Sequence, residues 1–124
     1  SEYYVAQRYY AMAHFSKFVP EGSRLISCKK DVNDRFSSMS REKLENYIGF
    51  RTNTAAFLTP DGKIVLVIVN GGKEHTFSLS GIEGRDHLTT YTTDGNRKVE
   101  LTYDGAYQQT LTIPAYSITT AIFE

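Results

Sequence analysis

The chain has 124 residues, with 14 Lys and Arg balanced by 14 Asp and Glu, so its formal net charge is zero. This length is enough for one domain with its own hydrophobic core, and it is too short for an enzyme barrel of about 250 residues. A chain without excess positive charge is not expected to bind nucleic acid or an anionic membrane surface. The longest aliphatic run, Ile64 to Val69, is also far shorter than the roughly 20 residues that cross a bilayer.

One helix is predicted over residues 2–18, which contain neither Gly nor Pro. Its apolar positions follow helical spacing and cover more than one side, so we expect the helix to be buried on several sides. Pro20 and Gly22 end the helix and turn the chain. The helix follows Ser1 directly, without an initiator methionine, so we expect a piece of a longer protein. No linker follows the helix, which should therefore pack directly on the next domain.

The rest of the chain consists mainly of short β-rich runs. The expected strands are residues 23–28, 50–58, 63–69, 75–79, 87–93, 99–101, 107–113 and 116–123. This pattern predicts a mainly β fold, an antiparallel β-sandwich of about seven or eight strands preceded by one N-terminal helix. The aliphatic run Ile64 to Val69 predicts a central strand covered on both faces, whereas alternation in residues 107–113 predicts a strand with one wet face.

Turn residues separate these runs. The pairs at residues 61–62, 94–95 and 104–105 are Asp-Gly, which predicts tight reversals, and the glycines at positions 71, 72 and 81 mark further turns. We therefore expect strands that follow each other in the sequence to pair. Residues 31–47 form a polar insertion, with a short helix expected over residues 41–47 and capped by Ser40.

The sequence predicts no catalytic pair, no metal site and no cofactor. Glycoside hydrolysis needs two carboxylates held about 5 to 9.5 Å apart in a cleft. The aspartates of this chain that precede glycines are expected to stabilise their own turns, and most glutamates lie in polar surroundings. The three histidines are far apart in the sequence, and the single cysteine, Cys28, is interpreted as a small hydrophobic residue.

Two features could contribute to binding. His14 lies on the apolar helix, one turn from aromatic residues on either side, where a packed and hydrogen-bonded interface histidine is the favoured interpretation. Exposed tyrosines could stack on sugar rings, although cross-strand aromatic pairs that stabilise the sheet are favoured. The candidates for stacking are Tyr91, Tyr103 and Tyr107.

Residues 9–23 read YYAMAHFSKFVPEGS and resemble the last barrel helix and exit turn of glycoside hydrolase family 30, above all its glucosylceramidase branch. The segment from His14 to Ser23 is the most specific part. The resemblance continues through residues 55–63 and 65–70 and ends at residues 113–120, in the order of that family's terminal strands. One departure is the insertion at residues 31–47, where the glucosylceramidase pattern passes almost directly from one strand to the next.

Enzymes of this family resemble a barrel fused to a β-sandwich and hydrolyse β-glycosidic bonds with retention, using two glutamates at the ends of barrel strands. Both glutamates would precede Ser1, so no catalytic residue is assigned to this chain. The resemblance implies that residues 1–22 are the last helix and exit turn of a barrel absent from this chain, and that residues 23–124 are the β-sandwich domain. The implied barrel-docking surface consists of Tyr3, Tyr10, His14, Phe15 and Phe18.

The resemblance therefore implies a non-catalytic part of a glycosidase. Its expected partners are the catalytic barrel of the same parent protein and the parent's carbohydrate or glycolipid substrate. A glucosylceramidase-type parent would be secreted or lysosomal. The family's sandwich usually takes a strand from before the barrel, so one sheet edge is expected to be open or filled by another copy. Two alternatives stay open: a stand-alone carbohydrate-binding module, and a docking protein that self-associates through residues 2–18.

Overall fold

A computed structural model describes residues 2–26, 52–79, 81, 82 and 84–124 of the chain. In these residues one helix, α1 (Glu2–Phe18), precedes eight strands that pair only antiparallel. The strands are β1 (Arg24–Ile26), β2 (Thr52–Leu58), β3 (Ile64–Asn70), β4 (His75–Ser78), β5 (His87–Thr93), β6 (Glu100–Ala106), β7 (Thr110–Ile113) and β8 (Ser117–Phe123). The predicted mainly β fold with a helix near the N-terminus is confirmed. The insertion at residues 31–47 and its expected helix lie outside the described residues.

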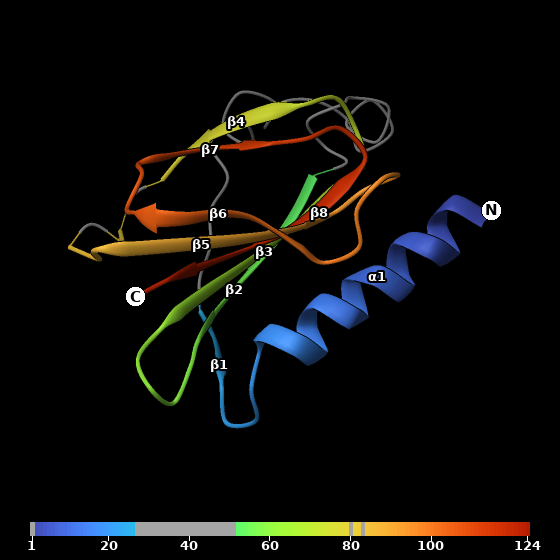
Figure 1. The fold of residues 1–124 in the computed structure, drawn as a ribbon. Coiled ribbons are helices and arrows are strands. Elements are labelled where there is room, and N and C mark those ends of the chain that lie inside the picture. Colours follow the sequence, from blue (N-terminus) through green and yellow to red (C-terminus); the bar gives the residue numbers. More distant parts are fainter. Residues whose placement is uncertain (1, 27–51, 80, 83) are drawn as a thin grey trace, which may run out of the picture.

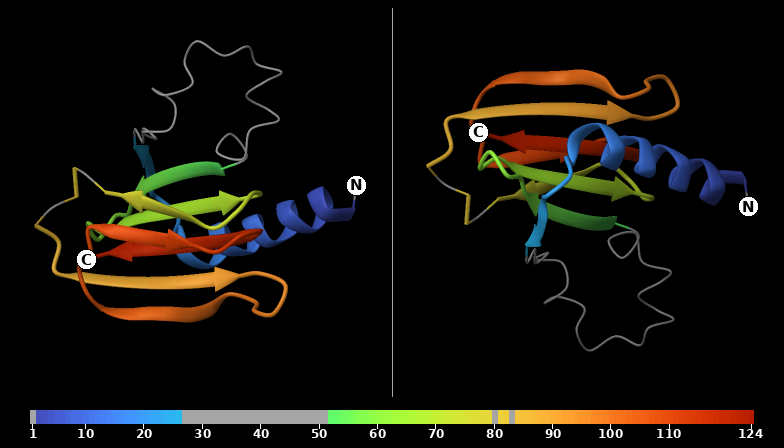
Figure 2. Two further views of the ribbon diagram at one scale, coloured as in Figure 1. Left: turned by 90° about the horizontal axis from the view of Figure 1, so that it is seen from above. Right: turned by 90° about the horizontal axis from the view of Figure 1, so that it is seen from below.

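The described strands form two sheets. One sheet has six strands in the order β1-β2-β3-β8-β5-β6, and β4 pairs with β7 in the other. Figures 1 and 2 show that β4 and β7 lie over one face of the six-stranded sheet and that α1 lies against the opposite face. A sheet that is apolar on both faces needs such a cover on each side, which accounts for the three layers.

β3 is the centre of the larger sheet. It lies between β2 and β8, and Leu66 and Ile68 are 8% and 0% exposed. Because successive side chains of a strand point to opposite faces, Leu66 and Ile68 join the core between the sheets, whereas Val65 and Val67 face α1. The aliphatic run is therefore a central strand with both faces covered, as predicted.

The core between the sheets contains side chains from both layers. Its buried members are Ala56, Leu66, Ile68, Leu88, Leu111, Ile113, Ala121 and Phe123. Each of the larger side chains contributes about 1.5–3 kcal/mol by leaving water. In β7, Leu111 and Ile113 point into this core while the two threonines of the strand are exposed, which confirms the predicted alternation for residues 110–113. Residues 107–109, which are expected in the same strand, lie outside β7.

The prediction that consecutive strands pair holds for β1 with β2, β2 with β3 and β5 with β6. It is wrong for the rest of the described strands. β8 returns from the end of the chain to pair with both β3 and β5, and β4 pairs with β7. Turn residues specify where a chain reverses locally, and they carry no information about which distant strand a returning segment joins.

The expected reversals at residues 61–62 and 94–95 occur, between β2 and β3 and between β5 and β6. The third one is wrong, because Asp104 and Gly105 lie inside β6. Gly105 serves packing there rather than a turn. A Cβ atom at this position would lie 3.0 Å from Tyr103 Oη.

The loops at one end of the sandwich are tied together by Asn70, the last residue of β3. Its side chain is 1% exposed, and its amide nitrogen donates to the carbonyls of Lys73 at 2.8 Å and Pro114 at 2.9 Å. Its side-chain oxygen accepts from the Gly72 amide at 3.0 Å. One buried amide therefore joins the β3–β4 connection to the β7–β8 connection.

Candidate functional site

α1 packs on the six-stranded sheet through aromatic and small side chains. The residues that make this contact are Tyr10, Ala11, Phe15 and Phe18 of the helix and Val19, which follows it. Phe15 meets Phe57 of β2 in an edge-to-face arrangement with ring centroids 5.6 Å apart. The ring centroid of Phe18 lies 4.5 Å from that of Tyr91 on β5, and the two ring planes are tilted by 31°. The expected direct packing of the helix on the β domain is confirmed.

The structure therefore turns most of the implied barrel-docking surface toward the sandwich. Tyr10, Phe15 and Phe18 contact the sheet, and His14 is buried against it. Tyr3 lies in the first turn of α1, on a part of the helix that projects beyond the sheet (Figure 1). Met12 is 69% exposed and marks the side of the helix that faces away from the sheet.

His14 is the polar centre of this helix–sheet joint. Its ring is 0% exposed, with Nδ1 2.8 Å from Thr120 Oγ1 on β8 and Nε2 2.7 Å from Thr93 Oγ1 on β5. β5 and β8 are neighbours in the sheet, so the imidazole connects the helix to two adjacent strands. The packed, hydrogen-bonded interface histidine that the sequence favours is what the structure contains.

The environment of His14 favours the neutral imidazole. Burial, together with the positive charge of Lys17, lowers the pKa of His14 from 6.5 to about 4. The Lys17 ammonium lies 5.6 Å from the Phe18 ring centroid and 5.8 Å from that of Tyr91. At neutral pH the joint therefore holds an uncharged ring with both nitrogens hydrogen-bonded.

The three tyrosines considered for sugar stacking do not form one surface. Tyr91 faces α1 and packs on Phe18. Tyr103 and Tyr107 pack on the opposite side of the sheet, against the core between the sheets. The Tyr103 hydroxyl donates to the Ala106 carbonyl at 2.7 Å. The ring centroid of Tyr107 lies 6.2 Å from that of Phe123. All three are half-buried packing residues rather than a flat platform.

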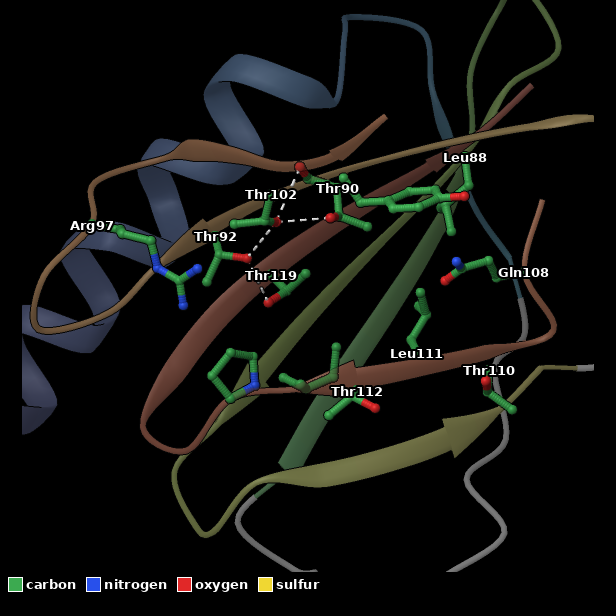
Figure 3. A pocket seen from close by; sticks show the side chains of 13 residues that line it. Leu88, Thr90, Thr92, Arg97, Thr102, Gln108, Thr110, Leu111, Thr112 and Thr119 are labelled. Carbon is green, nitrogen blue, oxygen red and sulfur yellow. Dashed lines mark hydrogen bonds between the residues drawn. The ribbon is translucent and has the colours of Figure 1, made fainter. Parts of the chain in front are cut away.

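A cleft of about 330 Å³ lies between the two sheets, where β7 runs opposite β5, β6 and β8 (Figure 3). Such a volume is in the range of about 300–1,000 Å³ of small-ligand sites. One wall is a row of threonines on the inner face of the larger sheet. The residues of this row are Thr90, Thr92, Thr102 and Thr119.

The hydroxyls of the threonine row are hydrogen-bonded to one another. Thr102 Oγ1 lies 2.8 Å from Thr90 Oγ1 and 3.0 Å from Thr92 Oγ1, and Thr92 Oγ1 lies 3.3 Å from Thr119 Oγ1. Each hydroxyl can donate one hydrogen bond and accept two, so the threonines of the row can pair with one another and still accept a hydrogen bond from a group in the cleft. The inner face of the sheet is thus apolar at Leu88 and polar along this row.

The other cleft wall is β7, all four residues of which line it. β4 occupies one edge of β7, and within the described residues no strand pairs with the other edge. Arg97 lies at the cleft end, where its guanidinium donates to Asp94 Oδ2 at 2.5 and 3.1 Å. This hydrogen bond lowers the pKa of Asp94 and raises that of Arg97. The ion pair leaves the cleft without net charge.

Residues 2–26, 52–79, 81, 82 and 84–124 contain no group of three His, Cys, Asp or Glu residues that could hold a metal ion. No helix in the same part of the chain is long and apolar enough to cross a membrane. The described carboxylate of Asp94 is engaged by Arg97, and that of Asp61 accepts a hydrogen bond from Thr59, which lowers its pKa.

The site residues that no sequence pattern indicated are threonines and one asparagine. Thr93 and Thr120 hold His14, and Asn70 joins two loops. The available signal is the doubled threonines at residues 89–90, 92–93 and 119–120. In a half-buried strand such a pair puts one hydroxyl on each face, here one toward α1 and one toward the cleft.

Three solved structures share this fold, and two of them are named as family 30 xylanases. The GH30 endoxylanase from Clostridium papyrosolvens C71 has a TM-score of 0.70 and 21% identity over 95% of this chain and 28% of its own. The catalytic domain of GH30 xylanase C from Talaromyces cellulolyticus has a TM-score of 0.69 and 26% identity, over 93% and 23%. A conserved exported protein from Bacteroides fragilis has a TM-score of 0.66 and 20% identity, over 89% of this chain and 20% of its own.

This chain thus spans 28% or less of the length of these structures. No curated protein sequence matches it. The family model described as the glycosyl hydrolase family 30 beta sandwich domain matches residues 48–121, which is more than half of the chain and includes β2 to β7 and most of β8. The chain therefore belongs to the glycosyl hydrolase family 30 β-sandwich domain family.

Proposed function

We propose that this chain is the non-catalytic C-terminal part of a retaining β-glycosidase, in which it stabilises and orients the catalytic barrel. Residues 1–22 would be the last barrel helix and exit turn, and residues 23–124 the sandwich. The main observation behind the proposal is that α1 is packed on one side and exposed on another. One side is packed on the sheet through Phe15 and Phe18, while Met12 on another side is 69% exposed.

The contact with the barrel is proposed for the surface of α1 that the sheet leaves uncovered. Met12 belongs to this surface, and the first turns of the helix, which include Tyr3 and project beyond the sheet, are proposed to extend it (Figure 2). The opposite side of the helix contacts the sandwich and holds the helix in a defined orientation. The residues of this contact are Tyr10, His14, Phe15 and Phe18. A helix packed on two partners transmits the position of one to the other without a flexible linker.

The cleft supports a second contact with the parent protein. A strand from outside this chain would pair with the edge of β7 that β4 does not occupy and would cover the threonine row. A two-stranded sheet is marginal by itself, and one more strand gives it a second set of main-chain hydrogen bonds. This strand is proposed to come from the segment that precedes the barrel.

For the substrate, we propose a β-glucosylceramide-type glycolipid, which would place the parent enzyme in a secreted or lysosomal setting. The support is the specific segment from His14 to Ser23, which resembles the glucosylceramidase branch. The alternative substrate is a carbohydrate polymer, since the two family 30 structures above are xylanases by name. In both cases the substrate would contact the barrel, and the sandwich would act by supporting it.

The proposal is tested by the intact mass of the native gene product, compared with the 14.0 kDa of this chain. We expect a much larger product whose upstream sequence contains a βα-repeat region with two glutamates at strand ends. This product should hydrolyse either glucosylceramide or xylan, and the 124-residue chain alone should hydrolyse neither. A native product of about the mass of this chain, or hydrolysis by the chain itself, would overturn the proposal.

A further inference from the structure

The joint between α1 and the sheet contains a group that can change its charge. His14 is fully buried there, and its two ring nitrogens contact hydroxyls on two different strands. The rest of the contact is apolar and aromatic, formed by side chains such as Phe15, Phe18 and Val67. A charge on the ring would therefore arise at a position without solvent exposure.

The hydrogen-bond arrangement fits the neutral ring. A neutral imidazole has one donor and one acceptor nitrogen, so one threonine hydroxyl donates to it and the other accepts. Thr93 Oγ1 already accepts from the Val99 amide at 2.8 Å. A protonated His14 donates from both nitrogens, which requires Thr93 Oγ1 to accept twice and both hydroxyl protons to point away from the ring.

The charged groups around His14 do not compensate a positive ring. On α1 the nearest contributor is Lys17, which has the same sign. On the β5 side, Asp94 follows Thr93 directly, and its carboxylate is engaged by Arg97. Tyr91 of β5 packs on Phe18. Among the described residues, the buried side chains of β3 and β8 on the side of α1 are Val65, Val67, Ile118 and Thr120, which carry no charge. Protonation would thus bury an uncompensated charge.

We propose that His14 is an acid-sensitive latch: the neutral ring holds α1 on the sheet, and protonation of the ring releases the helix while the sheets stay folded. The sheets keep their own core between β3, β8 and β7, which does not include α1. The latch concerns this contact alone, so it stands independently of any catalytic barrel.

The direction of the pH effect follows from linkage. Burial and the charge of Lys17 lower the pKa of His14 to about 4, below the usual 6.5 of a histidine in an unfolded or released helix. The released state therefore binds more protons between these values, and the latch is fully closed above pH 6.5 and weakens as the pH falls toward 4. Each pH unit in this window is expected to favour the released state by up to about tenfold.

The test is made on the 124-residue chain by NMR between pH 7.5 and 3.5. The ring signals of His14 report its protonation, and hydrogen-exchange protection factors of residues 10–18 report the attachment of α1. We expect both to change together with a midpoint between pH 4 and 6.5, with the α1 protection factors falling at least tenfold and those of β3 unchanged. Lys17→Met keeps an apolar side chain near Phe18 and removes the like charge, so it should raise this midpoint.

His14→Gln removes the titration and is expected to leave the α1 protection factors independent of pH, while His87→Gln at an exposed histidine is the matched control that keeps the transition. If His14→Gln does not fold, the wild-type titration decides by itself. A ring that titrates near 6.5, or a loss of α1 protection at a pH where the ring stays neutral, would overturn the latch. An equal loss in His14→Gln would do the same.

Discussion

The ring of Tyr103 lies over Gly105 on the same face of β6, so that a Cβ atom at position 105 would be 3.0 Å from Tyr103 Oη and 3.2 Å from Tyr103 Cζ. The same hydroxyl donates to the Ala106 carbonyl at 2.7 Å. Residues two apart on a strand share a face, so the glycine leaves room for the ring next to it. This packing explains why an Asp-Gly pair stands inside a strand.

Gly105→Ala is therefore expected to displace the Tyr103 hydroxyl and weaken its hydrogen bond to Ala106. The free energy of unfolding should fall by about 1 kcal/mol, as measured by urea denaturation. Gly95→Ala is the matched control, since no described atom lies within 4 Å of its added Cβ. It should change stability by less than about 0.5 kcal/mol. Equal effects at the two glycines would contradict the packing role of Tyr103.

Asn70→Ala should be among the more damaging substitutions in the loops. It removes the donors to the partly buried carbonyls of Lys73 and Pro114 and the acceptor for the buried Gly72 amide. We expect a loss of about 2–4 kcal/mol in unfolding free energy. The exposed Asn96→Ala is the control and should lose less than about 0.5 kcal/mol. A loss at Asn70 no larger than that at Asn96 would count against the role of Asn70 in joining the loops.

Tyr91→Ala distinguishes packing from sugar binding. Because the ring packs on Phe18 at 4.5 Å, its removal should lower the unfolding free energy by about 2 kcal/mol. Titration calorimetry of the wild-type chain with xylan and glucan should give no saturable heat that depends on Tyr91. Met12→Ala, at a 69% exposed position of α1, is the stability control. Saturable binding that Tyr91→Ala abolishes would restore the carbohydrate-binding alternative.

The turn between β5 and β6 should respond to pH through Asp94. The hydrogen bond from Arg97 lowers the pKa of Asp94, so its stabilisation is present above the usual aspartate pKa and is lost as the pH falls through the lowered value. Arg97→Ala should lower the unfolding free energy by up to about 1 kcal/mol at pH 7. The difference from the wild type should shrink at pH 3 and below, and a constant difference from pH 7 to 2 would contradict this.

Several elements follow from local sequence alone. The segment that forms α1 contains neither Gly nor Pro, and it ends where Pro20 and Gly22 disfavour a helix. The aliphatic run of β3 has no polar face that could be exposed to water. The reversals at residues 61–62 and 94–95 also depend only on neighbouring residues. These features could be predicted because 3.6-residue and two-residue periodicities express local backbone geometry.

The sites were less accessible from sequence. His14 could be recognised as a buried interface residue, but its partners Thr93 and Thr120 are 79 and 106 residues away in the sequence. The side on which Tyr91 lies, opposite to Tyr103, depends on strand register and on a shift between Thr90 and Tyr91 in the β5–β6 pairing. A change of register by one residue moves a side chain to the other face, and no local pattern specifies it.

The fold class, the order of helix and strands, and the resemblance to glycoside hydrolase family 30 could thus be predicted without the structure, because periodicity, turn chemistry and a specific segment at residues 14–23 are all local. The tertiary structure decided that β8 lies between β3 and β5, that His14 connects α1 to both β5 and β8, and that the threonine row faces a cleft beside β7. These relationships arise from contacts between distant segments, whose energy depends on packing and burial that no single stretch of the chain contains.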